Sequence, residues 1–273
     1  MNRSPLKYYS QNGEDYLLWK FFNEKKRGFY IDVGAFDGIY LSNTFLFGNL
    51  GWDGICIEPH PETFSLLKKN RYNSINFNCA CIDDESISFV VLNMENMGYL
   101  STIDNSDERE QDIKERYKKR GFTFEGFQKT TVKAITLNSI LKQRKITKKI
   151  DFLKIDVEGA ELKVLEGFDI KKYQPRVIVL EANTSDSEKE LKDYLEEKDY
   201  FYVGRLGENI FFVRDKKDLA KMENIPINCV ITEQVHPLDP KYSVKSLLVG
   251  KTVNTKLQNN DNEQNKDGGA GSL

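Results

Sequence analysis

The sequence predicts an α/β fold built on a doubly wound sheet, mostly parallel with one antiparallel strand near the C-terminal end. Short apolar runs alternate with helical patterns across residues 28–215, the order that joins parallel strands by right-handed crossovers. A glycine turn at residues 34–38 follows the first run. The last two runs, at 200–206 and 209–214, are so close that they must form a hairpin, which makes one strand antiparallel.

The elements follow from local patterns of apolar residues and caps. A helix is expected after Ser10 or Asn12, with acids in its first turn, and another after Pro61, which suits a first helical turn. The predicted strands are residues 29–33, 54–57, 75–82, 88–92, a strand starting at 132, 151–155, 176–181, 200–206 and 209–214. The other predicted helices are 42–50, a helix ending near 141, 160–168 and 187–198.

Length, charge and cysteine content limit the class of protein. The 273 residues suffice for one α/β domain with appendages. Lys and Arg (40) nearly balance Asp and Glu (42), so no electrostatic argument favours nucleic acid or an anionic membrane. The four cysteines form no C-x-x-C pair and indicate buried, reduced thiols. Without a signal peptide or an apolar run of about 18 residues, we expect a cytoplasmic protein with no membrane span.

The stretch FYIDVGAFDGIYLSN, residues 29–43, organises the chain. A strand passes into a glycine turn, and a helix can begin near Ser42. This layout lets backbone N–H groups and a helix N-terminus approach a polar ligand. Gly34 and Gly38 lack a Cβ, so the chain can bend sharply there. An ordinary strand-to-loop turn is the alternative that this stretch alone leaves open.

The acids around this turn favour a cationic ligand. The second strand ends in Glu58, about 20 residues after the turn, where such folds hold ribose hydroxyls. The dinucleotide pattern G-x-G-x-x-G is replaced by D-x-G-x-x-x-G, which starts at Asp32 and includes Asp37. Two carboxylates would repel a pyrophosphate but suit a sulfonium. The turn therefore indicates S-adenosylmethionine rather than NAD.

The chain divides into a core domain and appendages. The expected parts are an N-terminal helical arm (1–27), the main domain (28–215) with a charged insertion (93–129), a C-terminal extension (216–253) and a disordered polar tail (254–273). Ile113 and Tyr117 are the only large apolar pair at helical spacing in the densely charged stretch 105–120, which favours a solvated surface helix. A lid over an acceptor site is the alternative. Apolar residues of the extension allow docking on the domain or on a second subunit, hence a possible homo-oligomer.

Four blocks of the sequence resemble the FkbM-type methyltransferases. They are SQNGED (10–15), YIDVGAFDG (30–38), IEP (57–59) and DFLKIDVEGAE (151–161), of which the last is the most specific. The resemblance covers residues 8–215. It implies a Rossmann-like class I methyltransferase fold, S-adenosylmethionine as cofactor, and a small-molecule or glycan acceptor. We expect O-methylation of a hydroxyl of a sugar, glycan or natural product, as in polysaccharide biosynthesis.

The resemblance also implies roles for individual residues. Gly34, Asp37 and Gly38 would cradle the methionine part of the cofactor, and Glu58 would hold the ribose. The cofactor-binding residues expected in all are Gln11, Glu14, Asp32, Gly34, Asp37, Gly38, Asn43, Glu58, Pro59, Cys81 and Asp83. Asn43 would be an extra donor, and the stretch ending at Asp83 would border the adenine. Helix capping explains Glu14 nearly as well as closure over the cofactor.

Three residues are candidates for chemistry. Asp156 and Glu181 each follow a buried-type strand, so both should lie at the carboxyl edge of the sheet, where ligands bind. His60 has a suitable ordinary pKa for a base, but it also suits the start of the helix at Pro61. Asp156 could equally cap the helix that follows it.

Other functions stay open at this point. Several carboxylates at one edge could bind a divalent ion, although no metal is our expectation. An NAD-dependent oxidoreductase and a non-catalytic cofactor-binding module are the competing functions. The missing G-x-G-x-x-G disfavours the first, and the intact acids Asp156, Glu158 and Glu181 disfavour the second.

Overall fold

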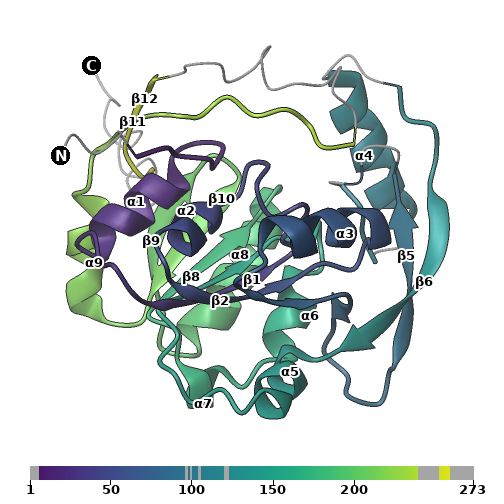
Figure 1. The fold of residues 1–273 in the computed structure, drawn as a ribbon, viewed down its shortest axis with the longest axis horizontal. Helices are drawn as coiled ribbons and strands as arrows, with labels where there is room; N and C mark the ends of the chain where they lie inside the picture. Colours follow the sequence, from purple (N-terminus) through teal and green to yellow (C-terminus); the bar gives the residue numbers. More distant parts are fainter. Residues whose placement is uncertain are drawn as a thin grey trace, which may run out of the picture.

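A computed structural model describes residues 6–95, 98, 100–103, 106–119, 123–238 and 252–258. Its centre is a seven-stranded sheet in the order β3-β2-β1-β7-β8-β10-β9 (Figure 1). The strands are β1 (Phe29–Val33), β2 (Asp53–Ile57), β3 (Ile75–Phe77), β7 (Phe152–Ile155), β8 (Val177–Glu181), β9 (Phe201–Leu206) and β10 (Asn209–Val213). In this sheet β10 runs antiparallel to the other six strands. The predicted α/β class and the terminal hairpin are confirmed.

Strand register brings four chain segments to one edge of the sheet. Val33 lies beside both Ile57 and Ile155, and Ile155 lies beside Leu180. These four parallel strands therefore end nearly level. The residues that come next lie together at this carboxyl edge: Gly34, Glu58, Asp156 and Glu181.

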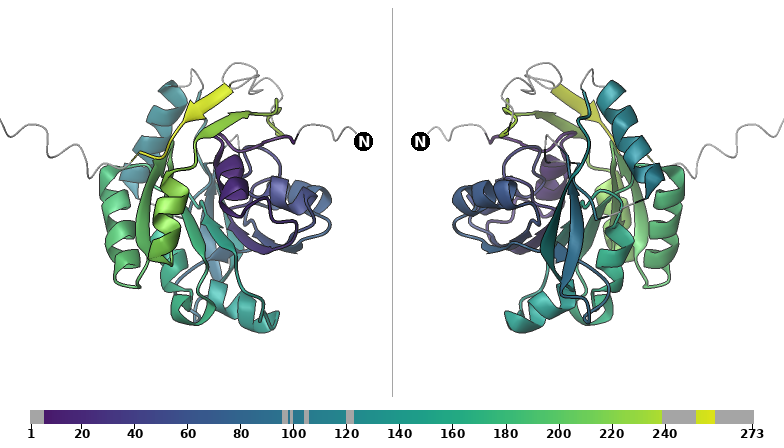
Figure 2. Two further views of the ribbon diagram at one scale, coloured as in Figure 1. Left: turned by 90° about the vertical axis from the view of Figure 1, so that its left-hand side faces the viewer. Right: turned by 90° about the vertical axis from the view of Figure 1, so that its right-hand side faces the viewer.

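Helices cover both faces of the sheet (Figure 2). Alternate residues of β1 divide between the faces, with Ile31 and Val33 in one core cluster and Tyr30 in the other. On the first face lie α5 (Leu137–Gln143), α6 (Glu161–Glu166), α7 (Ile170–Tyr173) and α8 (Ser185–Glu196). On the second lie α1 (Glu14–Phe21), α2 (Phe45–Asn49), α3 (Pro61–Asn70) and α9 (Lys216–Glu223).

The predicted strand at 75–82 is two separate strands, which corrects that prediction. Ile75–Phe77 stays in the main sheet as β3, whereas β4 (Ala80–Cys81) joins a small sheet with β5 (Phe89–Met94) and β6 (Gln128–Ile135). The break falls at Asn78, whose side chain donates to the backbone oxygens of Glu58 at 2.8 Å and Pro59 at 3.1 Å. These side-chain bonds tie the end of β2 to the start of the small sheet.

The charged insertion contains a surface helix, and one face of this helix is buried. It forms α4 (Asp107–Lys119), which lies beside β5 and β6 (Figure 1). Ile113 and Tyr117 are fully buried and pack with Leu100 in a cluster of their own. Apolar contacts therefore hold one face of α4 against the protein.

The C-terminal extension packs on the domain of its own chain. Ile227, Cys229 and Ile231 are buried in the core cluster on the second face. Strand β11 (Ile227–Val230) pairs with β12 (Thr252–Thr255). Within the described residues, these apolar groups are used inside the chain, so they no longer argue for a second subunit.

The expected tail is ordered at its start. Gln258 exchanges two backbone hydrogen bonds with Arg205, at 2.8 and 2.9 Å, and Leu257 packs against the second core cluster. Pairing therefore continues past residue 254, where we expected disorder to begin. Residues 259–273 of the expected tail lie outside the described residues.

Truncation after Val253 should lower the melting temperature by several degrees. It removes two backbone hydrogen bonds, each worth about 1 kcal/mol, together with the Leu257 contact. For a chain of this size, each kcal/mol corresponds to roughly 2–4 °C. Truncation after Gln258 is the matched control and should leave the melting temperature unchanged. Equal melting by calorimetry for both truncations would show that residues 254–258 contribute nothing.

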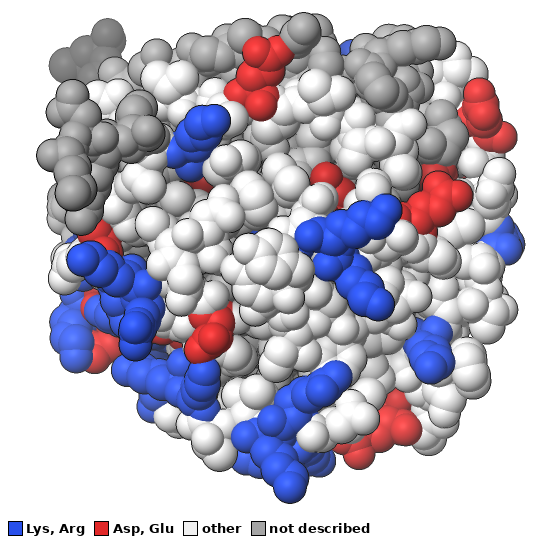
Figure 3. All heavy atoms as spheres, viewed as in Figure 1, with Lys and Arg blue, Asp and Glu red and all other residues white. Residues whose placement is uncertain are grey.

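No helix among the described residues is long and apolar enough to cross a membrane. On the face viewed in Figure 1, Lys and Arg form small groups along the lower and left edges, with acidic residues among them (Figure 3). The net charge of −2 agrees with this mixed surface. This face offers no broad basic surface of the kind that binds nucleic acid.

Candidate active site

The glycine turn after β1 lies directly against the end of β7. Gly34 has φ +83°, and a Cβ there would lie 1.7 Å from the backbone oxygen of Asp156. A side chain at residue 34 is excluded because the φ angle is positive and because the Asp156 oxygen lies too close. The cofactor turn and Asp156 are therefore neighbours, as the sheet register predicts.

Arg71, the residue that follows α3, stabilises the glycine turn. The guanidinium is buried and donates from Nε to the backbone oxygen of Gly38 at 2.7 Å. It also donates to the Tyr30 hydroxyl at 3.0 Å and to the Ser42 hydroxyl at 2.9 Å. One side chain thus joins β1, the turn and the approach to α2, which holds the turn in one shape.

The carboxylate of Asp32 belongs to this same buried network. Its Oδ2 accepts from the Thr44 hydroxyl at 2.5 Å and lies 3.8 Å from Nη2 of Arg71. Burial raises the pKa of Asp32, although the charge of Arg71 opposes this shift. Within the described residues Asp32 therefore stabilises the turn through these contacts. Our argument that two carboxylates favour a sulfonium ligand is left with only one of them.

Asp37 and Asn43 differ in how their polar atoms are used. Oδ1 of Asp37 accepts from the backbone N–H groups of Ile39 at 2.9 Å and Tyr40 at 2.7 Å, so it shapes the turn. Asn43 is buried, and its Nδ2 has no hydrogen-bond partner among the described residues. A buried donor without a partner is costly, and a bound polar ligand would satisfy it. Asn43 thus fits its expected role as a cofactor donor.

Glu58 ends β2 as a buried carboxylate. Its two oxygens accept from the backbone N–H groups of Phe36 and His60, each at 2.8 Å. Burial raises the pKa of Glu58 to about 7, despite these two hydrogen bonds. Each carboxylate oxygen keeps a second lone pair, so ribose hydroxyls can still donate to it. Pro59, the next residue, contributes its backbone oxygen to Asn78.

His60 is the N-cap of α3. Its Nδ1 accepts from the backbone N–H of Glu62 at 3.3 Å, and burial lowers the pKa of the ring. The capping interpretation therefore explains His60 without a role as a base. We remove it from the leading catalytic candidates.

Cofactor affinity should depend on the ionisation of Glu58. Only the carboxylate accepts two ribose donors, so affinity for S-adenosylhomocysteine should fall as pH drops below about 7. Between roughly pH 8 and pH 6 the fall should approach tenfold. Glu58→Ala should bind about tenfold more weakly at pH 8, a loss of ~1.4 kcal/mol, and its affinity should change little with pH. A wild-type affinity by calorimetry as flat as that of Glu58→Ala would refute the ribose assignment.

A polar chain links the N-terminal SQNGED motif to Asp156. Glu14 accepts from Nδ2 of Asn209 at 3.0 Å. Asn209 in turn accepts from the buried Lys154 ammonium at 2.8 Å, and Lys154 donates to Asp156 at 3.0 Å. Glu14 therefore belongs to the group of polar side chains that positions Lys154, and its cofactor role remains a prediction.

The remaining expected cofactor residues have different surroundings. Gln11 donates to Glu208 at 3.3 Å, so it reaches the turn between β9 and β10. The Cys81 side chain is buried in the core of the first face, and burial raises the pKa of its thiol well above the usual value. Asp83 is exposed. For Gln11, Cys81 and Asp83, a cofactor role remains a prediction.

Asp156 and Glu181 are a carboxyl pair whose pKa values are shifted in opposite directions. Burial favours protonation of both, but Lys154 supplies a charge and a hydrogen bond that lower the pKa of Asp156. Burial and the charge of Asp156 raise the pKa of Glu181 well above its usual value. The pKa values of the two carboxyl groups are thus shifted in opposite directions, an arrangement typical of sites that move protons.

Glu158 connects this pair to α4. It accepts from Arg109 at 2.5 Å and from Arg116 at 2.7 Å, and all three side chains are largely buried. Arg116 also lies 3.8 Å from Glu181. Glu158 has φ +58°, which is unfavourable for a residue with a side chain and which these contacts help to maintain.

The three acids also have the spacing of a metal site. Ligand atoms of Asp156, Glu158 and Glu181 lie within 4.8 Å of one another. However, Lys154 is bonded to the first, and Arg109 and Arg116 are paired with the second. A divalent ion would have to displace buried basic groups, so we still expect no metal here.

The sheet order and this edge site define an S-adenosylmethionine-dependent methyltransferase of class I. The family described as the Methyltransferase FkbM domain matches residues 32–202, and this chain belongs to that family. The expected resemblance, the methyltransferase class and the cofactor are confirmed. The NAD-dependent and non-catalytic alternatives are left without support. No curated protein matches the chain.

Several solved methyltransferases resemble the chain at low identity. A TehB-like SAM-dependent methyltransferase from Corynebacterium glutamicum shares 9% identity (TM-score 0.38, 74% of this chain, 88% of that one). An O-methyltransferase from Bacillus cereus in complex with SAH shares 9% (TM-score 0.37, 77% and 82%). The ribosomal protein L11 methylase of Lactobacillus delbrueckii subsp. bulgaricus shares 12% (TM-score 0.37, 72% and 74%). The assignment rests on the family match and the sheet order.

Proposed function

We propose that this protein is an O-methyltransferase that transfers the methyl group to a hydroxyl of a sugar, glycan or natural product. The observation that carries the proposal is Asp156. Its carboxylate is kept ionised by Lys154, and its backbone oxygen lies against Gly34 of the glycine turn. A hydroxyl acceptor must lose a proton as it reacts, and a carboxylate beside the cofactor can accept it.

The proposed mechanism relies mainly on position. The bound cofactor supplies a sulfonium methyl that is already activated. Glu58 and Asn43 hold the cofactor, and Asp156 accepts the proton of the acceptor hydroxyl as its oxygen aligns with the methyl carbon. Burial and the charge of Asp156 raise the pKa of Glu181, which lies beside it. Helix α4 limits the access of water at this edge, since Arg109 and Arg116 bind it to Glu158.

Methyl transfer to defined acceptors tests the proposal. The purified protein is incubated with methyl-labelled S-adenosylmethionine and a panel of nucleotide sugars, oligosaccharides and hydroxylated natural products. We expect the mass of one methyl group to be added to a hydroxyl of at least one of them. Transfer to amines, carboxylates or nucleic acid, with none to any hydroxyl, would contradict O-methylation. From the sequence analysis, we also propose a cytoplasmic location and a place in polysaccharide biosynthesis.

A further inference from the structure

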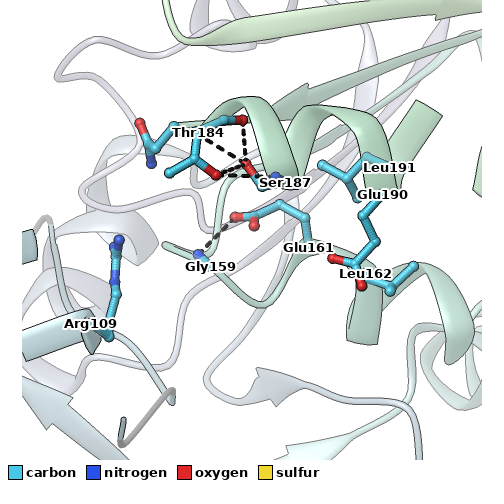
Figure 4. Close-up of a pocket in the computed structure, with 9 residues that line it drawn as sticks. Arg109, Gly159, Glu161, Leu162, Thr184, Ser187, Glu190 and Leu191 are labelled. Carbon is cyan, nitrogen blue, oxygen red and sulfur yellow. Dashed lines mark hydrogen bonds between the residues drawn. The ribbon is translucent and has the colours of Figure 1, made fainter. Parts of the chain in front are cut away.

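A cavity of about 150 Å³ opens beside the catalytic edge (Figure 4). It lies between α4, the turn after β7 and the N-terminal part of α8. Arg109 lines it from α4, Gly159 and Glu161 from the turn, and Thr184 and Ser187 from the start of α8. A cavity of about 150 Å³ is large enough for one six-membered ring.

One buried donor beside this cavity has no partner among the described residues. The Arg109 side chain is 8% exposed and donates from its two terminal nitrogens to Asp112 and Glu158. Its Nε has no hydrogen-bond partner among the described residues. The Nε is the atom nearest to the place that a Cβ on Gly159 would occupy, at 3.8 Å. A ligand oxygen in the cavity would satisfy this donor.

The charges around the cavity favour a neutral ligand. Asp112 and Glu158 pair with Arg109, and Glu158 also pairs with Arg116. The lining acids Glu161 and Glu190 have no basic partner among the described ion pairs, and burial raises the pKa of Glu161 to about 7. Acids in the first turn of α8 also offset the positive end of its dipole. An anionic group would therefore meet mainly repulsion here, while hydroxyls find both donors and acceptors.

We propose that this cavity is the acceptor site and holds one neutral sugar ring, with Arg109 Nε donating to a ring or hydroxyl oxygen. The inference rests on the proposed O-methyltransferase function and narrows its acceptor. Arg109 contacts Glu158, whose carboxylate lies within 4.8 Å of that of Asp156. A hydroxyl that projects from the bound ring past Glu158 is thus directed toward Asp156.

Binding of matched glycosides tests the charge preference. The probes are the methyl glycosides of glucose, galactose, mannose and rhamnose, and of glucuronate and galacturonate, each added to the protein with S-adenosylhomocysteine. We expect at least one neutral glycoside to bind, about tenfold or more tightly than either uronate. Equal or tighter binding of a uronate overturns the proposal, and so does binding of none of the six while S-adenosylhomocysteine still binds. If S-adenosylhomocysteine itself does not bind, the result instead contradicts the proposed function.

Two variants distinguish the effect of Arg109 Nε as a donor from the effect of the ion pairs that Arg109 makes. Arg109→Lys keeps a positive charge beside Asp112 and Glu158 but removes Nε as a donor. With the glycoside that binds, Arg109→Lys should raise KM about tenfold and change kcat and S-adenosylhomocysteine affinity little. Asp112→Asn weakens the same ion pair and leaves Nε in place, so its KM should match the wild type. An unchanged KM in Arg109→Lys, or an equal rise in both variants, shows that Nε does not bind the acceptor.

Discussion

Replacing Asp156 with Asn should lower turnover by about 100-fold or more while cofactor affinity stays close to that of the wild type. This is roughly 2.7 kcal/mol of transition-state stabilisation, within the range of a well-placed general base. Asn has nearly the shape of Asp, and its amide oxygen can still accept from Lys154, at 3.0 Å in the wild type. It cannot accept the proton of a hydroxyl. Single-turnover rates and calorimetry with S-adenosylhomocysteine measure the two effects separately.

The structure removes the main alternative role for Asp156, under which the Asn variant would change little. We considered Asp156 as a helix cap, but α6 begins at Glu161, and no side-chain cap forms at its N-cap Ala160. Instead, Glu161 accepts from the backbone N–H groups of Val157 at 3.0 Å and Gly159 at 3.2 Å. Comparable turnover in wild type and Asp156→Asn would move the catalytic assignment to Glu181. Loss of cofactor binding would make Asp156 a cofactor ligand.

Local patterns were sufficient to predict the sheet and the edge at which the site lies. Apolar runs determined the strands, and parallel strands with helical crossovers place their carboxyl ends together, so Glu58, Asp156 and Glu181 could be grouped in advance. Segments whose pairing depends on distant residues were harder to predict from the sequence. The split between β3 and β4 depends on Asn78, and β12 pairs with a strand more than twenty residues earlier in the chain.

The basic residues of the site could not be found from the sequence. Arg71 follows a helix as one more residue after Lys68 and Lys69, and only the folded turn shows that it joins β1 to α2. Lys154 lies within an apolar strand and was interpreted as part of it. The pairing of Asp32 with Arg71 could not be predicted, because the two residues are nearly forty positions apart in the chain. Hydrogen bonds between distant side chains leave no periodic pattern in a sequence.

The same limit explains why the buried face of α4 was not predicted. Its many charges predict a solvated surface, and Arg109 and Arg116 could be part of such a surface. Both instead turn inward to Glu158, a residue that follows a different strand. Charge alone therefore does not separate a solvated face from a face that pairs with buried acids.

Replacing Glu158 with Ala should release α4 from the catalytic edge. Removal of one member of a buried ion pair costs about 3–5 kcal/mol, because the remaining charge is left buried. We expect the lower end of this range, since Arg109 keeps Asp112 at 2.7 Å and Arg116 keeps Glu181 at 3.8 Å. A cost of ~3 kcal/mol corresponds to an increase of about 100-fold in the opening equilibrium.

Hydrogen exchange of the α4 amides measures this effect directly, because a partly detached helix loses its protection before the main sheet unfolds. Glu110→Ala is the matched control on the same helix, since its ion pair with Lys114 is about half exposed and should change stability by less than about 0.5 kcal/mol. If α4 keeps wild-type protection in Glu158→Ala, then Ile113 and Tyr117 alone hold the helix. The ion pairs with Glu158 would then serve to position the acid at the edge of the sheet rather than to close the site.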